Sequence, residues 1–82
     1  MATVKGDCVY FILDTETGTE ECRVSDIALL DKAREKGAVG PDRLVQIFEQ
    51  YRDEIERIAR AKLARGEYDL GGILVKTLDL NK

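Results

Sequence analysis

Residues 40–66 read GPDRLVQIFEQYRDEIERIARAKLARG, and this stretch predicts one long amphipathic helix. Pro41 stands where the first turn of a helix tolerates proline, Asp42 follows it, and Gly66 supplies the stop. The apolar residues recur at steps of three and four and form one stripe, which consists of Leu44, Ile47, Phe48, Tyr51, Ile55, Ile58 and Ala59. We therefore expect the rest of the chain to pack against this helix.

The predicted helix is long compared with the strands it would cover. About 24 helical residues reach roughly 36 Å, whereas a six-residue strand spans about 20 Å. The last turns, Ala59 to Arg65, should therefore overhang the sheet. They either project into solvent or pack on another copy of the chain.

The chain length indicates one domain, residues 1–82, in which residues 1–7 form a flexible lead-in with little to bury. A domain of this size buries only about 60% of its unfolded surface, so a second copy is a natural source of stability. The formal net charge of −3 disfavours non-specific attraction to nucleic acid or anionic lipid. The small size of the domain therefore favours a homodimer.

The chain shows no signal for a membrane. Its longest apolar run, CVYFIL at residues 8–13, is far shorter than a membrane span, and the first eight residues contain no apolar segment of a secretory signal. We expect a cytoplasmic protein with no membrane contact. In that reducing compartment Cys8 and Cys22 are expected to be free thiols, because a turn near Gly18 sets them out of register for a disulfide.

The first half of the chain predicts a β-hairpin. Residues 8–13 are apolar on both faces, so this strand is central or its second face, with Tyr10 and Ile12, meets a partner. The turn residues 14–18 are followed by an alternating second strand at residues 19–24, whose polar composition suits an edge strand.

Two further elements complete the predicted fold. Ser25 is placed to cap a short helix, Asp26 to Lys36, that ends at Gly37, and a third strand spans Ile73 to Leu80. The expected fold class is α+β, in the element order β-β-α-α-β. Its three-stranded antiparallel sheet has the order 2-1-3, with the third strand beside the first, and both helices pack on one face.

The residue inventory argues against an enzyme. The chain has no His, and its single Ser is explained as a helix cap, so Ser-His and Cys-His nucleophiles are excluded. Asp14, Glu16, Glu20 and Glu21 cluster at the hairpin tip, where a solvated turn is the simpler explanation. The sequence contains no zinc-ligand pattern, phosphate-binding loop or dinucleotide fingerprint, so no catalytic residue, metal or cofactor is expected.

The C-terminal half of the long helix carries four cations and no acid, namely Arg57, Arg60, Lys62 and Arg65. Clustered cations can contact nucleic-acid phosphates, but cations also favour helix C-termini through the helix dipole, and that explanation is preferred. Lys62 is unusual because it falls within the apolar stripe. Either its stem covers the core while the ammonium reaches water, or it faces a ligand.

The ordered pattern of CVYFIL, ECRVSDIALLDKA, IFEQYRDEIERIARAKL and a C-terminal apolar strand resembles the small bacterial proteins of domain of unknown function family 1488. The resemblance covers roughly Val9 to Leu80. It implies a small α+β layer of a hairpin, two helices and a last strand, together with a bacterial source. The family implies no established activity and no site residue.

These observations predict an uncharacterised small bacterial protein that acts as a non-enzymatic protein-interaction or regulatory module and self-associates. Its protein partner is not identified by the sequence. The alternative is a weak nucleic-acid-binding protein that uses the basic half of the long helix. The candidate interaction residues are Arg57, Arg60, Lys62, Arg65, Tyr10 and Ile12.

Overall fold

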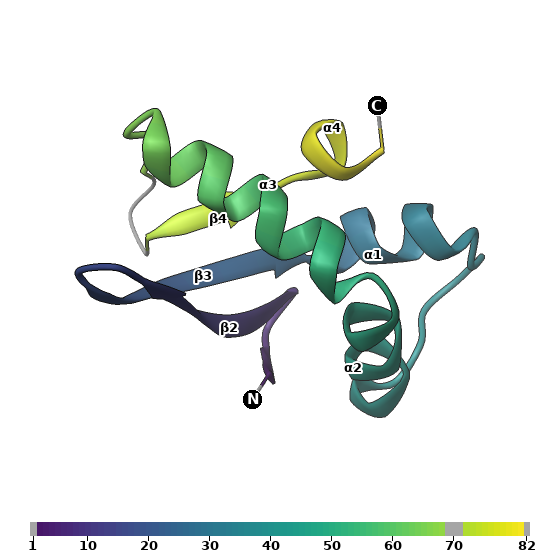
Figure 1. Cartoon of the computed structure of the whole chain (residues 1–82). Coiled ribbons are helices and arrows are strands. Elements are labelled where there is room, and N and C mark those ends of the chain that lie inside the picture. Colours follow the sequence, from purple (N-terminus) through teal and green to yellow (C-terminus); the bar gives the residue numbers. More distant parts are fainter. Residues whose placement is uncertain (1, 69–71, 82) are drawn as a thin grey trace.

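A computed structural model describes residues 2–68 and 72–81 of the chain (Figure 1). Its elements in chain order are β1 (Thr3–Lys5), β2 (Cys8–Thr15), β3 (Gly18–Ser25), α1 (Asp26–Ala33), α2 (Pro41–Gln50), α3 (Arg52–Ala64), β4 (Ile73–Val75) and α4 (Thr77–Leu80). The α+β class predicted from the sequence is confirmed, whereas several details of the sheet and helices differ.

The sheet has four strands in the order β1-β2-β3-β4 and is mixed rather than antiparallel. The pairs β1–β2 and β2–β3 are antiparallel, but β4 runs parallel to β3, with Ile73 opposite Cys22 and Val75 opposite Val24. The predicted order 2-1-3 is therefore wrong, because the last strand lies beside the second strand of the hairpin. The long helical connection between β3 and β4 makes this parallel pairing possible.

The N-terminal residues form an element that the sequence did not predict. Thr3, Val4 and Lys5 pair with Tyr10, Val9 and Cys8, and they occupy the edge of the sheet where the last strand was expected. Residues 2–7 are therefore not a loose lead-in. The strand β2 is central, as predicted, while β3 is also central and not the edge strand.

The hairpin itself agrees with the prediction. β2 and β3 meet at a two-residue turn, and Thr15 pairs with Gly18. Cys22 lies opposite Phe11 and Cys8 lies opposite Ser25, so the two cysteines are three positions out of register, and both are free thiols.

The first helix begins as predicted and ends earlier. The side chain of Ser25 accepts a hydrogen bond of 3.1 Å from the backbone N–H of Ala28, which is the expected cap. Helix α1 ends at Ala33, where Arg34 takes the left-handed conformation (φ 57°), three residues before the predicted stop at Gly37.

The long predicted helix is broken at Tyr51 into α2 and α3, which run in different directions in Figure 1. Tyr51 has φ −110° and ψ 18°, outside the helical range. The bend lets α2 contact β1 and β2 while α3 contacts β2 and β4. A single straight helix could not contact both β1 and β4, which lie at the two edges of the sheet.

The core lies between these helices and one face of the sheet. Its buried residues alternate along the strands and follow the predicted stripe along the helices, and they include Val9, Phe11, Leu13, Cys22, Val24, Leu29, Leu44, Ile47, Phe48, Ile55, Ala59, Ile73, Val75 and Leu80. Ala59 is fully buried, so the end of α3 does not overhang the sheet as expected. It packs against β4 and α4.

The parallel pairing of β3 and β4 depends on Gly72, which has a φ of +100° at the start of β4. A Cβ atom at this position would collide with the backbone carbonyl oxygen of Glu21. We expect Gly72→Ala to lower the free energy of unfolding by at least about 3 kcal/mol, because both the backbone conformation and the strand contact must change. Urea denaturation followed by circular dichroism measures this loss.

Gly66→Ala is the matched control. Gly66 also has a positive φ, +71°, but a Cβ atom there meets nothing within 4 Å. It should cost only about 1 kcal/mol, the strain of the left-handed conformation. Equal losses for the two variants would contradict the close contact between Gly72 and β3.

Candidate functional site

Lys62, the lysine that interrupts the apolar stripe, ends in a buried ion pair. The residue is 8% exposed, and its Nζ atom lies 2.8 Å from a carboxylate oxygen of Asp79 in α4 and 3.9 Å from one of Glu67. A buried ammonium requires such a partner. The Lys62 side chain is therefore largely buried, and its pair with Asp79 ties α4 to the end of α3.

Several contacts hold Asp79 in place. A carboxylate oxygen of Asp79 accepts a hydrogen bond of 2.9 Å from the backbone N–H of Lys76, which starts the short helix α4. Burial alone raises the pKa of Asp79, but the Lys62 ammonium and the Lys76 N–H lower it further than burial raises it, so the net pKa lies below the usual 3.8. Asn81 adds a hydrogen bond of 3.0 Å to the backbone oxygen of Ala28, and Leu80 is buried.

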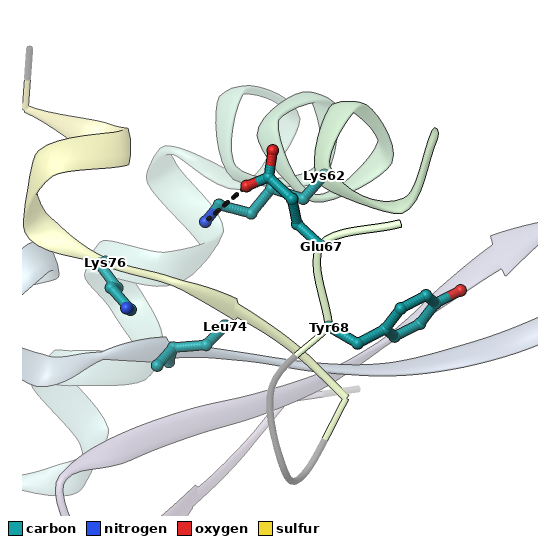
Figure 2. Close-up of a pocket in the computed structure, with 5 residues that line it drawn as sticks. All are labelled: Lys62, Glu67, Tyr68, Leu74 and Lys76. Atoms are coloured by element: carbon teal, nitrogen blue, oxygen red, sulfur yellow. Dashed lines mark ion pairs between the residues drawn. The ribbon is translucent and has the colours of Figure 1, made fainter. Parts of the chain in front are cut away.

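A pocket of about 280 Å³ opens beside this ion pair, at the free edge of β4 (Figure 2). It is lined by Lys62, Glu67, Tyr68, Leu74 and Lys76. Two cations, one carboxylate and one aromatic ring thus surround a hollow near the lower end of the ~300–1,000 Å³ range of small-molecule sites. This pocket is the candidate functional site.

The other cations of the predicted basic run are dispersed by their contacts. Arg60 donates a hydrogen bond of 2.7 Å to the backbone oxygen of Asp14, and Arg65 pairs with Glu67. Arg57 is exposed and forms no ion pair with any residue that the structure describes. Since Lys62 is buried, the four residues do not make one exposed basic surface. Nucleic-acid binding by this run stays a prediction.

Tyr10 and Ile12, the remaining candidate residues, lie on the face of the sheet opposite the core. Ile12 is 46% exposed, which is high for a large apolar side chain in the middle of a central strand. Register places Arg23 and then Leu74 in the same row as Tyr10, and it places Glu21 beside Ile12. We call this set of residues, Tyr10, Ile12, Glu21, Arg23 and Leu74, the open face.

The thiols are not activated nucleophiles. Burial, followed by the charge of Glu20, raises the pKa of Cys22 to about 11, and burial and the neighbouring Asp7 also raise the pKa of Cys8. In the part of the chain that the structure describes, no group of three His, Cys, Asp or Glu residues could hold a metal ion. No helix there is long and apolar enough to cross a membrane.

The sequence reasoning singled out Lys62 but missed its partners. Asp79 and Lys76 were assigned to a strand spanning Ile73 to Leu80, whereas β4 ends at Val75 and α4 follows at once. A signal was available, because an aspartate three residues after a helix-capping position is a common feature of a helix start. Tyr68 and Leu74 gave no signal, since their proximity to Lys62 depends on where β4 pairs.

A small mixed sheet, covered by helices on one face and open on the other, is the class of fold that these contacts define. The family model described as "Protein of unknown function (DUF1488)" matches residues 3–75, and the chain belongs to this family. Comparison with curated proteins found no match, and neither did comparison with solved structures. The family resemblance expected from the sequence is thereby confirmed.

The Lys62–Asp79 pair should make stability depend on pH. Asp79→Asn should lower the free energy of unfolding at pH 7 by about 1–3 kcal/mol, because it leaves the largely buried Lys62 ammonium with only the more distant carboxylate of Glu67. A carboxyl group whose folded pKa is depressed stabilises the fold above its unfolded pKa and loses this effect as the pH falls through the folded pKa. The gap between wild type and variant should therefore be full at pH 7 and narrow below about pH 4.

Urea denaturation across this pH range measures the gap. Asp31→Asn, an exposed acid of α1, is the control and should change stability by less than about 0.5 kcal/mol. A gap that stays constant down to pH 2 would show that Asp79 stabilises the fold without its charge.

Proposed function

We propose that this protein is a non-enzymatic, cytoplasmic interaction module that self-associates through the open face of its sheet. The observation that carries the proposal is the exposed Ile12 on the central strand β2, on a face that also holds Tyr10 and Leu74. Three apolar residues between charged ones resemble a small interface core with a polar rim. A regulatory role through a further protein partner is compatible with such a module.

The arrangement of the open face is self-complementary. Tyr10 pairs with Arg23, and Ile12 pairs with Glu21, so an apolar and a charged residue lie side by side at each of two levels of the hairpin. Phe11 and Cys22 lie midway between these levels and point into the core. A twofold axis that crosses the strands at this midway level would exchange the two levels.

Two copies packed about that axis place side chains of complementary kind opposite each other. Tyr10 of one copy then lies opposite the partner's Ile12, and Glu21 lies opposite the partner's Arg23. Isologous contacts of this kind are the commonest in homo-oligomers, and sheets stack face to face at about 10 Å. The same geometry favours a second copy over an unrelated partner, because each residue type finds its complement in the chain itself.

Ile12→Glu should weaken self-association. The substitution places a carboxylate opposite the partner's Tyr10 and next to Glu21, so the dimer should weaken by at least about tenfold. Size-exclusion chromatography with light scattering at micromolar concentration should give twice the 9.2 kDa chain mass for wild type and 9.2 kDa for the variant. Ile27→Glu is the control, because Ile27 is 61% exposed on α1 and should leave the dimer intact.

Charge reversal adds a test of the axis. Glu21→Arg should weaken the dimer through like charges, and the double variant Glu21→Arg with Arg23→Glu should restore it. A monomeric wild type, or equal weakening by Ile27→Glu, would contradict the proposal.

A further inference from the structure

The pocket at the free edge of β4 contains more hydrogen-bond donors than its own acceptors use. The Lys62 ammonium has three N–H donors; Asp79 accepts at 2.8 Å, whereas Glu67 lies at 3.9 Å, beyond hydrogen-bond distance. Lys76 is exposed, and its ammonium forms no ion pair within residues 2–68 and 72–81. With respect to the described residues, donors from two lysines therefore remain open at one hollow.

The carboxylates of Asp79 and Glu67 pair with Lys62 but do not use all the donors of the two lysines. Asp79 is fixed by the backbone N–H of Lys76 as well as by Lys62. Glu67 pairs with Arg65. The hydrogen bond from the Arg65 guanidinium is the largest cause of the lowered pKa of Glu67. Among the residues that the structure describes, the lining residues and their ion-pair partners comprise three cations, Lys62, Arg65 and Lys76, and two acids, which leaves one positive charge unbalanced.

We propose that this pocket binds a small organic carboxylate. One carboxylate supplies the single negative charge and the two acceptor oxygens that the Lys62 and Lys76 ammonium groups lack. A phosphate monoester carries close to two negative charges at pH 7 and would overcompensate beside Asp79 and Glu67.

The rest of the pocket suits the organic part of such a ligand. Figure 2 shows the Lys62 and Lys76 ammonium groups toward the α4 side of the pocket, while the ring of Tyr68 extends at the opposite end and Leu74 lies below. Tyr68 is 57% exposed, so an apolar substituent that covers its ring removes apolar surface from water. An aromatic or branched apolar carboxylate matches the chemistry of both ends. This inference does not rest on self-association, although Leu74 belongs to both the pocket and the open face.

Titration of ¹⁵N-labelled full-length protein with benzoate, followed by NMR chemical shifts at pH 7, tests the proposal. Benzoate should give saturable shifts at Lys62, Leu74 and Lys76 with a Kd of about 1–10 mM, the range of a fragment of this size. Benzamide, which has the same shape without the charge, should bind at least about tenfold more weakly.

Three variants of the chain should separate the pocket from general effects. Lys76→Gln should weaken benzoate binding by about fivefold or more, whereas Lys36→Gln, an exposed lysine outside the pocket, should leave it within about twofold. Asp79→Asn should tighten binding, because it removes the acid that competes for Lys62, and a tighter complex cannot result from partial unfolding. Repeating the titration with Ile12→Glu keeps this test separate from the dimer.

Several results would overturn the proposal. These are the absence of saturable shifts up to 50 mM benzoate, equal binding of benzamide, and equal loss in Lys36→Gln and Lys76→Gln. Tighter binding of inorganic phosphate than of benzoate would also overturn it, because the pocket would then select a doubly charged anion.

Discussion

The parallel pairing of β3 with β4 is the constraint on which the rest of the structure depends. Parallel neighbours cannot be joined by a tight turn, and here the crossover contains α1, α2 and α3. These helices cover the sheet face that carries Phe11 and Val24. The crossover also places the end of α3 at the free edge of β4, where Lys62 lines the pocket and pairs with Asp79. The open face carries none of the crossover helices, because α1, α2 and α3 all pack on the opposite face of the sheet.

The break at Tyr51 follows from the same constraint. α2 must cover β1 and β2, and α3 must reach β4 on the opposite edge, so one straight helix cannot serve both. The apolar periodicity continues across the break, since Phe48 and Ile55 are both buried in one core. The sequence therefore predicts which residues are buried but not the change of direction. Neither a proline nor a glycine marks the break, and Tyr51 itself fits the apolar stripe.

Local features of the fold were predictable, and pairings between distant segments were not. The hairpin turn and the Ser25 cap each depend on neighbouring residues, whose conformational preferences are visible in sequence. The position of β4 was not predictable, because the apolar residues at 73–75 suit a place beside either hairpin strand. At the site, Lys62 stood out by breaking the apolar pattern. Its partner Asp79 did not, since the segment after Val75 is too short to show a helical period.

Some residues of the pocket lie within the segment that the family model matches, and others follow that segment. Lys62, Glu67, Tyr68 and Leu74 lie within the matched residues 3–75, and they give the pocket its walls. Lys76 and Asp79 follow the matched segment, and they decide its charge, because Asp79 neutralises Lys62 while Lys76 adds a cation. A change at these two positions alters the electrostatics of the pocket without altering the sheet or the open face. The proposed ligand preference of the pocket therefore rests largely on the few residues of the C-terminal segment, whereas the proposed self-association rests mainly on the hairpin.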